Sequence, residues 1–518
     1  MTRQGLLALV AVTAAGGLLR LLPLLGADVP VNDGGLFLTM ARDIRADGFA
    51  LPLTTTYNDM AIPFAYPPGG LYLTALLLSV GIGADDALRW LPFVASVATI
   101  PVVYLIGREI FGTWRMATAT AGFVAVSTGS YEWLVQGGGV TRAPGFLLAL
   151  LGILLAIRAY RARGLATSVA SGIAVGVTGL FHPQAAVFAA LSVALLWPFM
   201  AADRWVGLRR LVLIGGTSIA VVLPWLLVVI PRYGWEPFLS AAGTGGTPIV
   251  GVMSVIASRT SGGHFGILGV LTTLGLAVSF LRGYRLLAIW MLAIAIVDSR
   301  AAQPYISVPA ALGIAFLLRD VSRVLEPTFR RRPPSAGIAW TGRGIAITVA
   351  AVLFLATFAD SALGQRDLGT PLRAVSPGER EAMAWVASNT PADATFVVLS
   401  GRYWAADAVS EWFPVRADRH SAATVQGYEW LGDERFQRQQ QRAVDLAPCV
   451  ATGDQACIER WFADAGDVDY LFLTRSPDAL VAGLECCFEL AEQIGKLMPA
   501  EVVYDNDSAL VVRLGTRP

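Results

Sequence analysis

The sequence is poor in charge and contains very little lysine, histidine or cysteine. Only 15% of its 518 residues are charged, whereas soluble proteins carry about a quarter. Lys496 is the single lysine, and there are three histidines and four cysteines. The formal net charge is +1, so charge gives no argument for nucleic-acid binding. With 55% hydrophobic residues and a mean hydropathy of +0.58, the composition excludes one large soluble core.

The apolar residues come instead in repeated runs of roughly 16–22 residues, each long enough to cross a bilayer. The first run contains Arg20 and lacks a clear small-x-small cleavage site, so we expect a retained helix there. A shorter segment, Leu71–Ile82, follows "YPPGG" and is predicted to lie at the membrane edge without crossing. We therefore predict a multi-pass α-helical membrane protein with about eleven transmembrane helices, near residues 5–26, 91–107, 116–134, 144–160, 165–181, 184–200, 211–230, 265–281, 286–298, 305–318 and 344–362.

The distribution of arginine predicts the orientation of these spans. With a cytoplasmic N-terminus, the cytoplasmic segments hold 17 arginines and the longer outer loops hold seven. The positive-inside rule favours this arrangement, in which the protein is a multi-pass component of the cell membrane. The first long loop, 27–90, and everything after residue 363 are then extracytoplasmic. A full crossing by Leu71–Ile82 would reverse every later segment.

The tail from residue 363 to 518 differs in kind from the rest, because charges become frequent and apolar runs shorten. "PGEREAMAWVASNTPADATFVVLS" predicts a capped helix, a turn and a strand. "VDYLFLTR" and "SALVVRLG" predict further strands, with a helix near 477–495. We therefore divide the chain into a transmembrane domain, 1–362, and an extracytoplasmic soluble α/β domain, 363–518, of ordinary domain size.

All four cysteines lie in this tail, which predicts disulfides in an oxidising compartment and agrees with an extracytoplasmic location. Buried free thiols are the alternative, and no histidine stands at ligand spacing for a zinc site. Cys449 and Cys457 could close a local loop, but either could pair with Cys486 or Cys487. The two adjacent cysteines are not expected to pair with each other.

Ionisable residues gather at the outer ends of the predicted spans, and this pattern favours a shared polar cavity that opens outward. Taken singly, Arg142 could snorkel to lipid headgroups and His182 could cap a helix. Taken together, Asp33 is the candidate general base, and guanidinium groups at Arg142 and Arg300 suit a phosphate. The candidate site residues are Asp33 as catalytic residue and Asp59, Tyr66, Arg142, His182, Arg259 and Arg300 as substrate-binding residues.

Two familiar patterns are missing. "QGGGVTR" lacks the Gly-Lys-Ser/Thr ending of a phosphate-binding P-loop and follows no strand, so its glycines are expected to permit a close approach of backbone. Neither an internal repeat nor a cluster of mid-membrane charges is present, which argues against a transporter or flippase. A sensor with a ligand-binding outer domain would not need so many charges at the outer helix ends.

One arrangement along the first 115 residues resembles a known family. A first helix, an acidic residue in a long outer loop, "FAYPPGGLYL" and then "RWLPFVASVATIPVVYLIGREIFG" resemble the GT-C glycosyltransferases. These multi-pass enzymes use polyprenyl-phosphate-linked sugars and include protein O-mannosyltransferases, aminoarabinose transferases and the catalytic subunit of oligosaccharyltransferase. Beyond residue 115 the resemblance is one of topology only.

The resemblance implies that the first outer loop forms juxtamembrane helices and carries the catalytic aspartate, here Asp33. Many family members have Asp-Glu at this site, whereas this chain has Asp33-Gly34, and the loss of the second carboxylate weakens any metal assignment. No cofactor is predicted, and the sequence leaves metal dependence open. The Trp-Trp-Asp signature of oligosaccharyltransferase is also absent.

The sequence therefore predicts an inverting membrane glycosyltransferase. It would transfer a hexosyl or pentosyl group from a polyprenyl-phosphate donor to a glycan, lipid or protein acceptor on the extracytoplasmic face, among membrane lipids. Trp404, Trp412 and Trp430 could stack on sugar rings or pack in the core of the tail. The alternatives are a lipid-linked oligosaccharide transferase or polymer ligase, and a non-enzymatic lipid or sugar transporter.

Overall fold

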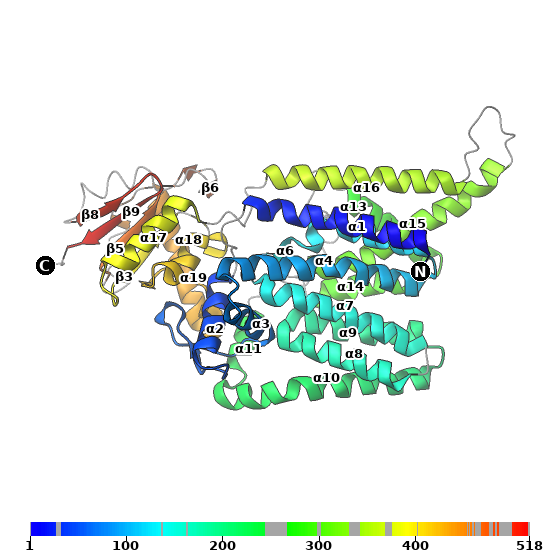
Figure 1. Cartoon of the computed structure of the whole chain (residues 1–518), viewed down its shortest axis with the longest axis horizontal. Coiled ribbons are helices and arrows are strands. Elements are labelled where there is room, and N and C mark those ends of the chain that lie inside the picture. The colour runs from blue at the N-terminus through cyan, green and yellow to red at the C-terminus, as the bar shows by residue number, and fades with distance from the viewer. Residues whose placement is uncertain are drawn as a thin grey trace.

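The protein is a long bundle of helices with a sheet-containing layer at one end. The computed structural model describes residues 2–26, 33–135, 138–161, 164–243, 267–297, 302–330, 342–367, 375–400, 402, 404–452, 454, 456–457, 460–461, 468–475, 480–481, 484–485 and 500–515. Figure 1 shows the long helices side by side, with the strands of the tail at one end and the N-terminus at the other. The small helices of the first long loop lie at the same end as the strands.

Each of the eleven predicted spans coincides with a helix. The helices are α1 (Arg3–Leu21), α4 (Ala84–Phe111), α5 (Trp114–Val126), α7 (Gly139–Arg161), α8 (Leu165–Phe181), α9 (Pro183–Met200), α10 (Arg204–Tyr233), α13 (Ile267–Leu281), α14 (Leu286–Val297), α15 (Ala302–Arg330) and α16 (Gly342–Asp367). Within the described residues, six helical segments are long and apolar enough to cross a membrane, and they include α1, α4, α7, α9, α10 and most of α15. The multi-pass membrane architecture is therefore confirmed, and the count of eleven crossings stays a prediction.

The first long loop folds into short elements that pack at the end of the bundle. It contains α2 (Gly34–Ala46), β1 (Thr54–Thr55), the 3-10 turn η2 (Tyr57–Asp59), β2 (Ile62–Pro63) and α3 (Gly69–Ser79). Eleven residues of α-helix span only about 16 Å. Because the hydrocarbon core of a bilayer is about 30 Å thick, α3 by its own length falls short of a crossing, as do other short apolar helices of the bundle such as α14.

The tail contains a mixed five-stranded sheet with the strand order β4-β3-β5-β9-β8. β3 lies parallel to both β4 and β5, whereas β9 lies antiparallel to its neighbours β5 and β8. The strands are β3 (Thr395–Leu399), β4 (His420–Ser421), β5 (Tyr470–Thr474), β8 (Ala500–Asp505) and β9 (Ala509–Leu514). α17 (Pro377–Asn389), α18 (Ala408–Arg416) and α19 (Asp433–Thr452) accompany them, with the turn η5 (Tyr428–Trp430) before α19.

Local sequence explains the start of this layer. The Ser376 side chain accepts a hydrogen bond from the backbone of Glu379, whose carboxylate accepts one from the Ser376 backbone, so α17 begins with a capping box. The helix predicted near 477–495 is wrong where the structure describes it. There β6 (Leu480–Val481) and β7 (Leu484–Glu485) form a small antiparallel pair, with Leu480 opposite Glu485 and Val481 opposite Leu484. The rest of that segment lies outside the described residues.

The end of the bundle and the tail share one hydrophobic core. Leu36 and Phe37 of α2, Phe64 of the first loop, and Trp412 and Phe396 of the tail belong to the same buried cluster. On the other face of the sheet, a separate cluster joins β3 to α19 through Val397, Leu399 and Leu446, among others. The tail therefore packs firmly on the first loop, and the two form the surroundings of any site at this end.

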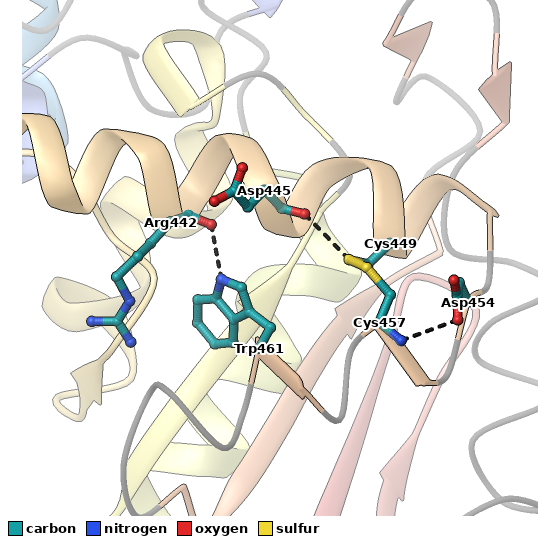
Figure 2. The surroundings of a disulfide bond; sticks show 6 residues. All are labelled: Arg442, Asp445, Cys449, Asp454, Cys457 and Trp461. Carbon is teal, nitrogen blue, oxygen red and sulfur yellow. Dashed lines mark hydrogen bonds between the residues drawn. A yellow bond between two sulfur atoms is a disulfide. The ribbon is translucent and has the colours of Figure 1, made fainter.

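A disulfide was predicted in the tail with its pairing left open, and the structure has one between Cys449 and Cys457. Figure 2 shows it at the end of α19, where the Cys449 sulfur lies 3.2 Å from the carbonyl oxygen of Asp445. Nearby, the indole nitrogen of Trp461 donates a 2.8 Å hydrogen bond to the carbonyl of Arg442. The disulfide thus links the end of α19 to Cys457, which follows the helix. Cys486 and Cys487 lie outside the described residues.

Candidate functional site

The structure brings two of the predicted site residues into direct contact. The Nη2 atom of Arg142 donates to the Oδ2 atom of Asp33 over 2.8 Å, although 109 residues separate them. The Arg142 side chain is 7% exposed and that of Asp33 is 29% exposed. The partly exposed carboxylate of Asp33 is therefore held by the buried guanidinium of Arg142, at the place where the first loop meets α7.

The backbone of Asp33 aims this carboxylate. Asp33 is the residue before α2 and has φ +71°, a left-handed conformation that aspartate and asparagine tolerate better than most residues. Its side chain makes no capping hydrogen bond to its own helix. The carboxylate is therefore directed to Arg142 rather than used to begin α2.

Arg142 lies in the first turn of α7, where a cation opposes the helix dipole. The ion pair with Asp33 offsets this cost, and the guanidinium also stacks over Trp133 with its carbon 3.8 Å from the ring centre. A Cβ atom on Gly138 would lie 2.6 Å from the guanidinium. The expected close approach at "QGGGVTR" is therefore real at Gly138, because only glycine leaves room for Arg142 there.

Tyr66 lies beside this pair. Its hydroxyl is 3.0 Å from the Thr141 hydroxyl, and its ring packs on Phe37 and Trp430 at centroid distances of 4.6 and 5.5 Å. Burial raises the pKa of Tyr66 well above its ordinary value, and Arg142 acts in the opposite direction. Tyr66 therefore stays a neutral phenol that can donate a hydrogen bond.

His182 is the N-cap of α9, where its Nδ1 atom accepts a 3.3 Å hydrogen bond from the backbone of Ala185. The hydroxyl of Tyr305, near the start of α15, lies 3.5 Å from the same nitrogen. A Cβ atom on Gly145 would lie 2.9 Å from the His182 Cβ. Gly145 comes one helical turn after Arg142, so the cap and the ion pair lie along the same stretch of α7.

Three other candidates do not join this cluster. Asp59 is exposed on the turn η2, and the described part of the chain shows no contact between its side chain and Asp33 or Arg142. Its neighbour Asn58 fixes the turn, exchanging hydrogen bonds of 3.0 and 2.7 Å with the backbone of Ser421. Arg259 and Arg300 lie outside the described residues.

One buried carboxylate of this site was missed in the sequence. Glu411 of α18 has no exposed surface, and its Oε1 atom accepts a 3.1 Å hydrogen bond from the backbone of Gly35 in the first turn of α2. The Tyr57 hydroxyl donates to the Glu411 carbonyl over 2.7 Å. Burial is the largest cause that raises the pKa of the Tyr57 hydroxyl well above its ordinary value, and the nearby charges of Glu411, Asp33 and Glu429 raise it further. The only signal was "SEWFPVRADRH", whose place beside α2 the sequence does not reveal.

The donor set suits proton and phosphate chemistry. Across the described residues, no three histidine, cysteine or acidic side chains come together in a way that could hold a metal ion. The site instead offers one accessible carboxylate, one guanidinium, a helix N-terminus that favours an anion, and a phenol. These groups can accept a proton and hold a phosphate a few ångströms apart.

Comparisons with known proteins concern the family and the fold. Residues 65–228 match the family model described as dolichyl-phosphate-mannose-protein mannosyltransferase. No curated protein matches the sequence. Among solved structures, ArnT from Cupriavidus metallidurans bound to undecaprenyl phosphate is 14% identical with a TM-score of 0.56, each chain being covered in full.

Two further structures have the same fold. The archaeal oligosaccharyltransferase AglB from Archaeoglobus fulgidus, in complex with an inhibitory peptide and a dolichol-phosphate, is 14% identical with a TM-score of 0.55. The match covers 91% of this chain and 69% of AglB. The arabinofuranosyltransferase AftD from Mycobacteria is 15% identical with a TM-score of 0.56, covering 100% of this chain and 40% of AftD. The resemblance seen in the sequence is thus confirmed: the chain has the fold of the GT-C glycosyltransferases, and its residues 65–228 are similar to their mannosyltransferase family.

Proposed function

We propose that the protein is an inverting glycosyltransferase that transfers a sugar from a polyprenyl-phosphate donor to an acceptor on the extracytoplasmic face of the membrane. The observation that carries the proposal is the contact between Asp33 and Arg142 at the end of the bundle. It sets a candidate base beside a candidate phosphate ligand in a fold whose solved examples include enzymes bound to polyprenyl phosphates.

In the proposed reaction, the carboxylate of Asp33 accepts the proton of the acceptor hydroxyl. The hydroxyl oxygen attacks the anomeric carbon as the bond from that carbon to the phosphate oxygen breaks, so the configuration inverts. The electron pair of the broken bond leaves with the polyprenyl phosphate. Its growing charge is stabilised by Arg142 and by the N-terminus of α7, which is the kind of stabilisation that lowers a barrier.

Arg142 links the two halves of this reaction. A guanidinium presents five N–H donors in a planar fork, so one edge can hold Asp33 while the other holds a phosphate oxygen. Tyr66, with its buried phenol, and His182, which packs against Gly145 one turn along α7, are proposed to complete the donor site. Arg300 precedes α15, whose Tyr305 contacts His182, so it is proposed as a second phosphate ligand, and Arg259 as an alternative.

The membrane arrangement completes the proposal. The polyprenyl tail would lie among the apolar side chains between the helices. The division into a transmembrane domain, 1–362, and an extracytoplasmic domain, 363–518, follows from the arginine distribution and the composition of the tail. Oxidised cysteines at 449 and 457 support this side of the membrane for the tail. The scheme needs no metal.

The test uses purified full-length protein in nanodiscs with radiolabelled polyprenyl-phosphate mannose, glucose and arabinofuranose as donors and a membrane extract as acceptor source. The parent should release polyprenyl phosphate from at least one donor. Asp33→Asn should lose about a hundredfold or more, as expected for removal of a general base. Asparagine suits this test because it tolerates the left-handed backbone of Asp33.

Two matched variants interpret the result. Asp507→Asn changes an exposed carboxylate between β8 and β9, away from the site, and should keep parental turnover. Asp59→Asn removes the other candidate base. Parental turnover in Asp33→Asn would refute its role as base, and loss in Asp59→Asn alone would transfer that role to Asp59. Consumption of none of the donors by the parent would refute the proposed function.

A further inference from the structure

A second pocket opens in the tail, away from the ion pair. It is lined by residues at and after the end of β3, by residues that follow β4 and by one side of α19. Its polar lining consists of Ser400, Arg402, Trp404, Asp407, Ser410 and Gln426. Nothing in the reaction proposed above uses these residues.

The pocket lies where the chain changes direction in the sheet. The connection after β3 leads to α18, which packs with Phe396 and Val398 on one face of the sheet. The connection after β4 leads to α19, which packs with Val397 and Leu399 on the opposite face. Because β3 and β4 are parallel neighbours, the two departing connections leave a crevice at their carboxyl ends. Crevices of this kind are the usual ligand-binding places of open α/β sheets.

The lining groups are held in place by one another. Asp407 is buried, and its two oxygens accept hydrogen bonds from the Ser400 hydroxyl at 2.5 Å and the Ser410 backbone at 3.0 Å. The amide of Gln426 donates to the carbonyl of Trp404 over 3.3 Å. A carboxylate has about four acceptor positions, so the bonds from Ser400, Ser410 and the Val409 backbone still leave acceptor capacity on Asp407. Rigid polar groups of this kind give a pocket its specificity.

The chemistry of this lining matches one ligand class. Sugar hydroxyls both donate and accept, and here a carboxylate, two serine hydroxyls, an amide and a guanidinium line one crevice beside an indole. Of the three tail tryptophans considered in the sequence, Trp412 is fully buried and Trp430 is 8% exposed in the core, whereas Trp404 lines the pocket. We propose that this pocket binds one sugar ring of a glycan acceptor.

The pocket and the Asp33 site share their walls. Ser410 lines the pocket, and the next residue of α18, Glu411, binds the first turn of α2 beside Asp33. Gln426 lines the pocket, and the same loop continues to Trp430, which packs on Tyr66. A glycan with one ring in the pocket could therefore extend along this wall toward Asp33. The acceptor role rests on the proposed function, whereas sugar binding by the pocket does not.

The experiment measures sugar binding without any donor lipid. Saturation-transfer NMR on the full chain in nanodiscs, with methyl α-mannopyranoside, methyl β-glucopyranoside and methyl α-arabinofuranoside as probes, should detect millimolar binding of at least one. Arg402→Ala should weaken that binding about tenfold, as expected for loss of a charged hydrogen bond, and Trp404→Ala should also weaken it. Arg438→Ala, on the exposed face of α19, is the matched control and should bind like the parent.

The outcomes separate this inference from the proposed function. Asp33→Asn should bind the probe normally while losing transfer. Binding that is unchanged in both Arg402→Ala and Trp404→Ala, or no binding of any probe by the parent, would overturn the pocket proposal and leave donor turnover as a separate result. If the parent binds the probe through Arg402 but turns over no donor, the pocket proposal is supported and the proposed transferase function is refuted.

Discussion

Glu411 is expected to control transfer without touching substrate, because it sets the start of α2 and so the position of Asp33. Its buried carboxylate accepts the hydrogen bond of Gly35, two residues after Asp33. Glu411→Ala removes this acceptor, and Glu411→Gln replaces the carboxylate by an amide whose oxygen can still accept. The two variants separate the effect of the hydrogen bond from the effect of the charge.

The magnitude follows from this single contact. A hydrogen bond to a charged group is worth about 1.5–3 kcal/mol. A charge at a helix N-terminus adds up to about 2 kcal/mol in partly buried settings, and part of that overlaps with the hydrogen bond. If about 2–3 kcal/mol of positioning is lost, transfer by Glu411→Ala falls about 30- to 150-fold. Glu411→Gln loses mainly the charge, about 1 kcal/mol, and transfer falls about fivefold.

The assay is donor turnover measured as kcat and KM, with Glu381→Ala on the exposed face of α17 as the matched control. A positioning role predicts a fall in kcat with the donor KM little changed, partial rescue by Gln, and a pH profile of the parental shape. If Glu411→Gln were as inactive as Asp33→Asn, Glu411 would itself be acting as a charge or base. If Glu411→Ala kept parental kcat, Asp33 would not depend on the tail.

Three further predictions concern the donor site, the membrane orientation and the tail. Arg142→Ala and Arg300→Ala should each weaken binding of a polyprenyl-phosphate analogue about tenfold or more. Lysine at either position should restore binding only in part, because its point charge lacks the planar fork of a guanidinium. If both Ala variants bind the analogue like the parent, this phosphate site is excluded. In a variant that lacks Cys486 and Cys487, an impermeant thiol reagent added to intact cells should label Cys449 and Cys457 only after reduction. If labelling also requires that the membrane be broken, the predicted orientation is wrong. Burial raises the pKa of Asp407, so the stability from this group is present at low pH and lost as pH rises through its folded pKa. The Tm of Asp407→Asn relative to the parent should therefore rise between pH 4 and pH 7, and a difference that stays constant would contradict this.

The helices of the bundle could be predicted because their signal is local. Runs of apolar residues predicted eleven helices at the positions where helices lie, and "YPPGG" predicted the short helix α3. Hydropathy reports burial or lipid contact, and does not report how long a helix becomes, so α4 and α15 extend well beyond the predicted apolar runs. The pairing of β6 with β7 was missed because strands of two residues are too short to carry a period that separates strand from helix.

At the site, the sequence predicted which residues take part better than it predicted which of them contact each other. Asp33 and Arg142 were chosen because each is ionisable at a helix end, and the structure adds that they bind each other. His182 was correctly considered as a helix cap. Their meeting depends on contacts across 109 residues, and a single sequence gives no register for such contacts. The glycine at 138, which makes room for Arg142, was the one local sign of close packing.

Glu411 shows why the tail could not be read as an independent unit. Gly35 and Glu411 are separated by 376 residues, and the composition changes sharply between them, so the sequence suggests two separate domains. In the structure the two residues are joined by a hydrogen bond. The turn η2 and β4 are joined as well, by the hydrogen bonds that Asn58 exchanges with Ser421. A Gly35 N–H without an acceptor would be costly at this buried place, so Glu411 of α18 stabilises the start of α2. The tail therefore helps to place the candidate base, and a ligand that shifts α18 would act on Asp33 through the Gly35–Glu411 hydrogen bond and the shared core.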